Sequence, residues 1–259
     1  MTGRYTFGDS DLALRRMAIA AEVFEPTSRA LLASAVTPGV GTALDLGCGA
    51  GHSTRLVAEV ARPDATVGVD GSERAVAAAR AATPDPAVRY VHADVAAVPL
   101  PGAPADLVYA RLLLAHLPDP LAVAERWLTQ LSPGGVLVLD EVEVIDPPPG
   151  VLRDYEELVV AVVATQGAAM YAGPLLAPLG GRCVDVDVDT SVAARMFGMN
   201  LVTWRDTALS HGISDGPHLH RVAAGLAALV DAGPGRSTVR WVLRQVVCPA
   251  SSALSGGRT

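Results

Sequence analysis

The chain of 259 residues contains no lysine, so all 20 of its basic residues are arginine, and 27 acidic residues leave a formal net charge of -7. Proteins that bind nucleic acid carry clustered basic side chains that neutralise phosphates, and this sequence has no such run. We therefore expect no nucleic-acid partner. The missing lysine accompanies a high content of Ala, Val and Leu, which indicates a coding bias and carries no chemical meaning.

Cysteines and long apolar segments are also scarce. The three cysteines are odd in number, and their spacing fits neither a disulfide framework nor a zinc site. The longest apolar runs, such as Leu158–Ala164, fall well short of the ~20 residues needed to cross a bilayer. Met1–Ser10 carries charges and lacks the apolar core of a signal peptide. The sequence predicts a cytoplasmic protein with no metal site and no membrane contact.

The first 146 residues alternate between short apolar runs and helical patterns. Strands that alternate with helices predict a parallel, doubly wound α/β sheet with right-handed crossovers. Two helical patterns, Asp9–Phe24 and Pro26–Ala35, come before the first strand. The expected strands are Ala43–Leu46, Thr66–Val69, Val88–Val91, Asp106–Ala110 and Val136–Val142, and the helices between them are His52–Val60, Glu73–Ala82 and Leu121–Leu131.

The pattern changes in the second part of the chain. A long apolar helix is expected at Val151–Thr165, and Ser191–Asp231 is mostly helical. Cys183–Val188 alternates between valine and aspartate, which is typical of a half-exposed strand, and Thr238–Val247 alternates again. With these two strands, the sequence predicts a mostly parallel seven-stranded sheet with helices on both faces.

A glycine-rich turn follows the first expected strand. Gly47, Gly49 and Gly51 stand just before a helix. Glycine lets the backbone turn tightly and lets a ligand approach without a Cβ clash, and the free N–H groups at a helix start attract an anion. A dinucleotide site uses the spacing G-x-G-x-x-G, and this chain has His52 in place of the third glycine. A carboxylate at Asp45 would repel a pyrophosphate and suits a ligand with a cationic end.

Acidic residues end the next two strands. Asp70 ends the second strand, where a carboxylate can accept hydrogen bonds from both hydroxyl groups of a ribose. Asp94 ends the third, and Leu131–Val138 forms a glycine-containing turn into the fifth. Together with the glycine-rich turn, these stretches resemble the class I methyltransferases that use S-adenosylmethionine. The resemblance implies a Rossmann-like fold and cofactor contacts from Asp45, Gly47, Gly49, Gly51, Asp70, Gly71, Asp94, Val95 and Arg111.

The resemblance also implies distinct roles within the cofactor site. In the family, the glycines wrap the methionine and ribose parts of the cofactor, which implies that Gly47, Gly49 and Gly51 do so here. Asp94 is implied to bind the adenine amino group, and the N–H of Val95 to face the ring.

The segment after the fourth strand narrows the resemblance. Tyr109–Pro120 is similar to the same region of bacterial small-molecule methyltransferases of the ubiquinone/menaquinone-biosynthesis type. Families that methylate amino groups of nucleobases carry Asn/Asp-Pro-Pro-Tyr after this strand, whereas this chain has Ala110-Arg111-Leu112-Leu113. We therefore expect a small-molecule acceptor.

The resemblance further suggests a division of the chain. Residues 1–36 are expected to form an N-terminal helical lid, and 37–146 the cofactor-binding Rossmann-like core. Residues 147–248 are expected to supply acceptor-side helices and the last two strands of the same sheet. The small, polar segment 249–259 predicts a disordered tail.

The reacting centre is expected where strands one and four diverge, because ligands of doubly wound sheets bind where the strand order reverses, and the family's order is 3-2-1-4-5. Arg111 is then a candidate to bind the methionine carboxylate through its guanidinium fork, or it is a surface arginine. His116 is a candidate general base, since the unperturbed pKa of histidine is about 6.5, or it is a structural residue of the turn. Glu141 and Glu143, at the end of strand five, are candidates to steer an amine or to take a proton, with Glu141 the preferred catalytic residue.

Scarce aromatic residues and a helical insert supply candidates for an acceptor pocket. Aromatic residues make up 4% of the chain, and Tyr5 is a candidate to close over the cofactor. Small-molecule sites are usually apolar with a few polar groups, but a helix packed on a sheet needs the same residue types, so core packing is the alternative. Together with His116, the expected acceptor-binding side chains are Tyr155, Tyr171, Met196, Asn200 and Trp204.

The sequence thus predicts an enzyme that transfers a methyl group from S-adenosylmethionine to an O, N or C atom of a small organic molecule, such as a secondary metabolite. We expect a monomer or a homodimer. Two alternatives stay open. A dinucleotide-dependent oxidoreductase is disfavoured by the missing third glycine and by Asp45. A protein that keeps the cofactor-binding fold for non-methylating chemistry, such as a cyclase or a binding subunit, is not excluded, because fold does not fix function.

Overall fold

The computed structural model describes residues 8, 10–235 and 237–250. Its sheet contains seven strands in the order β3-β2-β1-β4-β5-β7-β6. This order contains the predicted 3-2-1-4-5 arrangement. The strands are β1 (Thr42–Leu46), β2 (Ala65–Asp70), β3 (Val88–His92), β4 (Ala105–Arg111), β5 (Leu131–Asp146), β6 (Arg182–Asp189) and β7 (Thr238–Pro249).

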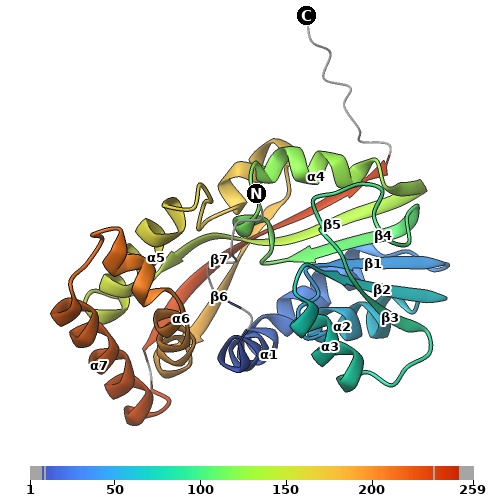
Figure 1. Ribbon diagram of the computed structural model, residues 1–259. Coiled ribbons are helices and arrows are strands. Elements are labelled where there is room, and N and C mark those ends of the chain that lie inside the picture. The colour runs from blue at the N-terminus through green and yellow to red at the C-terminus, as the bar shows by residue number, and fades with distance from the viewer. Residues whose placement is uncertain (1–7, 9, 236, 251–259) are drawn as a thin grey trace, which may run out of the picture.

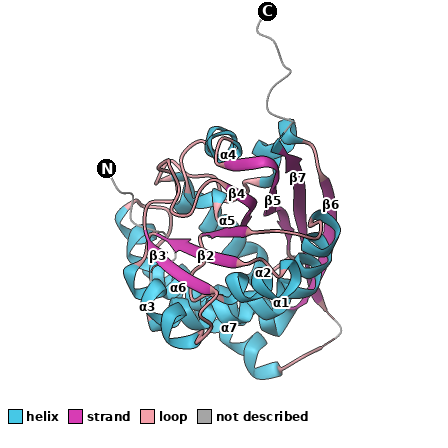
Figure 2. Cartoon of the chain, turned by 90° about the vertical axis from the view of Figure 1, so that its right-hand side faces the viewer, coloured by secondary structure: helices cyan, strands magenta, loops and turns pink. Residues whose placement is uncertain are grey.

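Helices cover both faces of this sheet (Figures 1 and 2). In Figure 1, α4 lies on one face, and α2 and α3 lie on the other. Figure 1 also shows α5, α6 and α7 gathered beyond the carboxyl end of β5, where the chain passes into α5. The helices are α1 (Asp11–Ala35), α2 (His52–Ala61), α3 (Glu73–Ala82), α4 (Pro120–Leu128), α5 (Val151–Ala164), α6 (Thr190–Ser210) and α7 (Gly216–Ala232), with 3-10 helices η1 (Leu114–His116) and η2 (Gly173–Leu179).

The strands β1 to β5 are parallel, and β7 runs antiparallel to both β5 and β6. The central strands β1, β2 and β4 are buried along most of their length. Parallel strands covered on both faces read as continuous apolar runs, which explains why the sequence locates them well. The strand β6 lies at the edge of the sheet and alternates in burial, as its valine–aspartate alternation predicts.

The strand β5 is much longer than its predicted core Val136–Val142. Its pairing with β4 ends at Arg111 and Asp140, but its pairing with β7 continues to Asp146. A three-stranded ribbon of β5, β7 and β6 therefore projects past β4 at the carboxyl edge. Figure 1 shows α5, α6 and α7 beside this projecting part.

The turn expected within Leu131–Val138 is wrong, because β5 already starts at Leu131. Leu131 pairs with Ala105, and the register then shifts before Leu107 pairs with Val136. A Cβ at Gly135 would lie 2.8 Å from the carbonyl oxygen of Ala105. Glycine thus lets β5 bulge past β4 and continue as a strand.

The two predicted N-terminal helices form a single helix, α1, with Pro26 inside it. A proline inside a helix removes one backbone hydrogen bond and usually breaks the helix. Here the helix buries Phe24 before the proline and Leu31 and Leu32 after it. Burial on both sides of Pro26 outweighs the local penalty, because packing supplies most helix stability in a folded protein.

Among the described residues, none of the helices combines the length and hydropathy needed to cross a bilayer.

Candidate functional site

The glycine-rich turn joins β1 to α2. Gly47, Gly49 and Gly51 have φ angles of 69°, 51° and 83°, in the left-handed region that glycine tolerates best. The backbone N–H groups of Gly47 and Cys48 both donate to the carbonyl of Val69, at 2.8 and 3.1 Å. This pair of bonds fixes the turn against the end of β2.

Asp45 lies under this turn and is fully buried. Its Oδ2 atom accepts hydrogen bonds from the hydroxyl groups of Ser53 and Thr54, each at 2.7 Å, and thereby holds the first turn of α2. Burial raises the pKa of Asp45 to about 6, against the lowering effect of these two hydroxyl groups. Its Oδ1 atom has no hydrogen-bond partner among the described residues, and the predicted contact of Asp45 with a cationic end of the ligand stays a prediction.

Asp70 ties the end of β2 to the glycine-rich turn. Its Oδ2 atom accepts the N–H of Gly49 at 2.8 Å, and its Oδ1 atom accepts the N–H of Ser72 at 2.8 Å. A carboxylate has about four acceptor positions. Asp70 can therefore accept further hydrogen bonds, such as those of ribose hydroxyl groups, while it holds the turn.

The ends of β2 and β3 lie side by side. The N–H of Ala93 donates to the carbonyl of Asp70 at 3.0 Å. Gly71 is exposed, and nothing lies within 4 Å of a Cβ built on it. The Asp94 side chain is exposed, and its Oδ1 accepts the N–H of Ala96, whereas Val95 is buried. The structure thus brings Asp70, Gly71 and Asp94 to the carboxyl edge beside the glycine-rich turn.

Glu141 lies inside the sheet, and its side chain is fully buried. Its Oε1 atom accepts the backbone N–H groups of Leu113 and Leu114, at 2.8 and 2.9 Å. Burial raises the pKa of Glu141 to about 7, although both hydrogen bonds lower it. The turn after β4 therefore depends on Glu141. The neighbouring Glu143 forms an ion pair with Arg244 at 2.7 Å.

Arg111 ends β4 among acidic groups. Its guanidinium donates to the hydroxyl of Ser28 at 3.3 Å, and that hydroxyl donates to Asp140 at 2.7 Å. Burial raises the pKa of Asp140, and the positive charge of Arg111 opposes this rise for both Asp140 and Asp45. Arg111 therefore helps to neutralise buried carboxylates, and its predicted contact with the methionine carboxylate stays a prediction.

His116 ends the short helix η1 and is partly buried. Burial lowers its pKa to about 3, and the positive charge of Arg16 lowers it further. The imidazole is therefore neutral at physiological pH, but a base with so low a pKa accepts a proton weakly. The general-base role of His116 stays a prediction that this environment does not favour.

Three of the expected acceptor-binding residues, Tyr155, Met196 and Trp204, belong to one buried apolar cluster. Tyr155 on α5 stacks on Phe197 with ring centroids 4.2 Å apart. Met196, Asn200 and Trp204 on α6 are buried with it. Tyr171 is partly buried and donates a short hydrogen bond to Glu156. Tyr5 lies outside the described residues.

Sequence reasoning missed the contacts that Met17 and Leu113 make with the glycine-rich turn. A Cβ at Gly49 would lie 3.1 Å from the sulfur of Met17, and one at Gly47 would lie 2.7 Å from the Leu113 side chain. Helix α1 and the turn after β4 therefore cover the glycine-rich turn. Only the expectation of a lid before the first strand pointed to α1.

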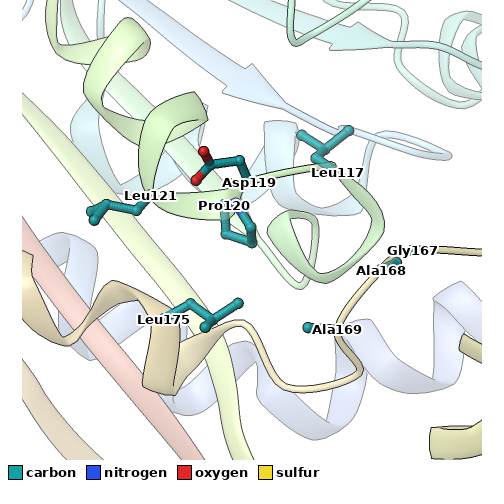
Figure 3. Close-up of a pocket in the computed structure, with 8 residues that line it drawn as sticks. All are labelled: Leu117, Asp119, Pro120, Leu121, Gly167, Ala168, Ala169 and Leu175. Carbon is teal, nitrogen blue, oxygen red and sulfur yellow. The ribbon is translucent and has the colours of Figure 1, made fainter. Parts of the chain in front are cut away.

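A cavity of about 410 Å³ opens beside η1. Figure 3 shows the start of α4 and the segment before it on one side, and the segment between α5 and η2 with η2 itself on the other. The lining is mostly apolar, in the manner of small-molecule sites. Its residues are Leu117, Asp119, Pro120, Leu121, Gly167, Ala168, Ala169 and Leu175.

No group of three or more His, Cys, Asp or Glu side chains in the described part of the chain is arranged to hold a metal ion.

Comparison with known proteins places this site in a family. Residues 44–139, from β1 to the middle of β5, match the model of the methyltransferase domain. This part of the chain is similar to a methyltransferase domain. The chain is 38% identical over 121 residues to a trans-aconitate 2-methyltransferase of Azoarcus, covering 47% of each chain. It is 35% identical over 152 residues to that of Variovorax paradoxus, covering 58% of each. The chain thus spans about half the length of the curated relatives that it matches.

Two solved structures share the fold over most of the chain. The Haemonchus contortus phosphoethanolamine N-methyltransferase 2 aligns with a TM-score of 0.52 and 16% identity, covering 90% of this chain and 57% of that one. The YcgJ protein from Bacillus subtilis aligns with a TM-score of 0.55 and 14% identity, covering 86% and 96%. The second half of the chain therefore follows a known fold.

The cofactor of this methyltransferase domain is S-adenosylmethionine, and the residues at the carboxyl edge fit it. Asp45 keeps an unpartnered buried oxygen near the glycine-rich turn, which suits a ligand with cationic groups. Asp70 and Asp94 offer carboxylates at the ends of β2 and β3, where a ribose and an amino group can donate to them. The left-handed glycines leave three positions of the turn without a Cβ atom.

Proposed function

We propose that this protein is a methyltransferase that uses S-adenosylmethionine to methylate a small organic molecule. The observation that carries the proposal is the glycine-rich turn at the carboxyl end of β1, held by Asp70 through the N–H of Gly49. The matched methyltransferase domain covers this turn and both acidic strand ends. The remaining cofactor contacts proposed are Asp45, Gly71, Asp94, Val95 and Arg111.

S-adenosylmethionine supplies an activated methyl group on a sulfonium: the S–CH₃ bond breaks, an O, N or C atom of the acceptor bonds to the methyl carbon, and sulfur keeps the electron pair. The protein must hold the acceptor in line at about 3–3.5 Å. It must also exclude water and, for a protonated acceptor, let a proton leave. Helix α1 is suited to exclude water, because Met17 lies on the turn at Gly49. His116, the last residue of η1, is a proposed acceptor contact.

The acceptor is proposed to enter through the cavity between η1 and η2 (Figure 3). A volume of about 410 Å³ suits a small molecule, and the absence of a basic run in the sequence does not favour a nucleic acid. The relatives are named for trans-aconitate, a small carboxylic acid. Trans-aconitate is therefore the first acceptor to test. Helices α5 to α7 lie beyond the matched domain, so they are proposed to set a specificity of their own.

Calorimetric titration and mass spectrometry test the proposal in sequence. We expect heat of binding with S-adenosylmethionine and S-adenosylhomocysteine and none with NAD. The protein is then incubated with S-adenosylmethionine and candidate acceptors, and we look for products heavier by one methyl group. Binding of NAD in place of the adenosyl ligands would restore the oxidoreductase alternative. Cofactor binding without methyl transfer to any small molecule would favour a cyclase or a binding subunit.

A further inference from the structure

The cavity of Figure 3 has a single charged side chain, Asp119, among its described lining residues. The other residues of this lining are leucine, proline, alanine and glycine, so none of them carries a positive charge. A carboxylate that leaves water without a basic or hydrogen-bonding partner loses free energy. The described walls therefore offer no compensation to an anionic ligand.

The carboxylate of Asp119 occupies the start of α4 at this cavity. Its Oδ1 atom accepts the N–H of Ala122 at 3.2 Å, and its backbone carbonyl accepts the N–H of Val123 at 3.0 Å. Pro120, the first residue of the helix, has no N–H to donate. The start of a helix attracts an anion through its free N–H groups and its dipole. Here the chain supplies that anion itself, so a ligand carboxylate would meet a like charge.

The opposite wall consists of small and apolar residues (Figure 3). Gly167, Ala168 and Ala169 lie in the segment between α5 and η2, and Leu175 lies on η2. Nothing lies within 4 Å of a Cβ built on Gly167, so the space beside this wall is not filled by neighbouring side chains. Leu175 is 43% exposed, which is high for a leucine. An apolar ligand in the cavity would remove that side chain from water, and this burial is favourable.

The cavity adjoins the short helix that leads to the cofactor-binding turn. Before this helix, the Leu113 side chain would lie 2.7 Å from a Cβ on Gly47. After it, Leu117 lines the cavity, and its N–H donates to the carbonyl of Leu114 at 3.1 Å. One turn of η1 therefore connects the cavity to the glycine-rich turn. This position suits an acceptor site.

We propose that the cavity takes an uncharged, apolar acceptor and that Asp119 excludes carboxylic acids from it. The inference rests on the proposed methyltransferase function and names the class of its acceptor. Apolar walls disfavour the burial of any charge, and the carboxylate of Asp119 repels anions in addition. Residues 167–175 of the opposite wall lie outside the matched residues 44–139, so the substrate in a relative's name does not fix the charge of this acceptor.

Three probes that share one apolar skeleton and differ in charge test the proposal. Cinnamyl alcohol, cinnamylamine and cinnamate are titrated at neutral pH into the full-length protein saturated with S-adenosylhomocysteine, and trans-aconitate is a second anion. Dissociation constants are measured by NMR. We expect the alcohol to bind at least about tenfold more tightly than cinnamate, with the amine between them. Tightest binding by the amine, binding of either anion equal to that of the alcohol, or no binding of the alcohol would overturn the proposal.

Asp119→Asn removes the charge and keeps the helix cap, because asparagine caps helices as well as aspartate does. Asparagine also tolerates the φ of 49° at this position. We expect cinnamate to bind about three- to tenfold more tightly to the variant, and cinnamyl alcohol as it binds to the parent. The control is Asp215→Asn at the cap of α7, where Asp215 accepts the N–H of His218 at 2.7 Å away from the cavity lining. An equal effect of the two substitutions on cinnamate would refute the role of Asp119.

Leu175→Arg places a positive charge on the opposite wall. The exposure of Leu175 leaves room for the longer side chain, and we expect the ratio of alcohol to cinnamate affinity to fall about tenfold or more. Leu209→Arg on α6 is the matched control, because Leu209 is 40% exposed and does not line the cavity. An unchanged ratio in Leu175→Arg would show that the probes bind elsewhere and would overturn the proposal. If Leu175→Arg does not fold, Asp119→Asn decides alone.

Cofactor binding and turnover separate this inference from the proposed function. A protein that binds S-adenosylmethionine and methylates a carboxylic acid with a higher kcat/KM than any uncharged acceptor would reject the inference and leave the function intact. A protein that binds neither S-adenosylmethionine nor S-adenosylhomocysteine would reject the function itself.

Discussion

The carboxylate of Glu141 holds the backbone N–H of Leu113 at 2.8 Å, across the boundary between β5 and the turn after β4. The Leu113 side chain in turn lies on Gly47, where an added Cβ would meet it at 2.7 Å. A buried acid in the sheet thus helps to hold the Leu113 side chain against the glycine-rich turn. We propose that Glu141 acts through Leu113 as a positioning residue, and its predicted catalytic role stays a prediction.

Replacing Glu141 by glutamine tests this role through the pH dependence of stability. The pKa of Glu141 is raised from 4.5 to about 7 by burial, so its stabilising contribution is complete below about 4.5 and is lost as the pH rises through 7. Glutamine stays neutral and still accepts both N–H groups. Relative to Glu141→Gln, the parent should lose roughly 3 kcal/mol between these pH values, since a tenfold change in acid dissociation corresponds to about 1.4 kcal/mol.

Urea unfolding of both proteins at pH 5 and pH 8 measures that difference. Asp45 and Asp140 are also buried acids with raised pKa values, but they are present in both proteins and cancel in the comparison. A difference between parent and Glu141→Gln that does not change with pH would show that Glu141 is ionised throughout this range.

Asp70→Ala should weaken S-adenosylmethionine binding by about 1.5–3 kcal/mol, the range for a hydrogen bond to a charged group. The change also frees the N–H of Gly49, so Asp70→Asn, which keeps an acceptor oxygen, should bind better than Asp70→Ala. Calorimetry measures both. The exposed Asp64, just before β2 at the opposite edge, supplies the control Asp64→Ala. Equal affinities for Asp70→Ala and Asp64→Ala would remove Asp70 from the site.

His116→Gln distinguishes a base from a binding residue. The pKa of His116 is lowered to about 3 by burial and by Arg16, so we expect no inflection from His116 between pH 5 and 8 in the profile of kcat/KM. The variant should lose less than about tenfold in kcat, whereas loss of a true general base costs about 10²–10⁴-fold. A larger loss, together with an inflection that disappears in the variant, would restore His116 as the base.

Ser28→Ala should loosen α1 from the sheet. The hydroxyl of Ser28 is fully buried and donates to Asp140 at 2.7 Å. Leaving that carboxylate short of a donor should cost about 1–3 kcal/mol in the free energy of unfolding. Ser34→Ala on the same helix is the control, since Ser34 is exposed and should stay within about 0.5 kcal/mol. Urea unfolding compares the two, and equal values would show that α1 is held by apolar packing alone.

The sequence predicts the sheet well because its buried parallel strands leave continuous apolar runs bounded by glycine and acidic residues. It fails where a local signal competes with packing. Pro26 indicates a helix end, yet the buried faces on both sides keep α1 continuous. The Pro-Gly-Gly stretch at 133–135 indicates a turn, yet it becomes a bulge inside β5.

The candidate site is likewise only partly predictable from the sequence. Gly47, Gly49, Gly51 and Asp70 are predictable, because a strand end and the turn after it fix their position in the fold. The contact between Ser28 and Asp140 joins residues 112 positions apart, and no local sequence pattern predicts such a contact. The sequence pattern also does not distinguish a buried acidic residue in an apolar strand from one that faces solvent. The sequence therefore could not assign Glu141 to the interior.

The position of β7 between β5 and β6 has a consequence for synthesis of the chain. The edge of β5 from Val136 to Asp146 finds its partner only in β7, about 90 residues later in the chain. Until β7 has been synthesised, that edge is bare, and an unpaired apolar edge is a template for pairing with other chains. We therefore expect the sheet to be completed only once β7 is available to pair. A fragment that stops before Thr238 should aggregate, even though it contains the whole matched domain.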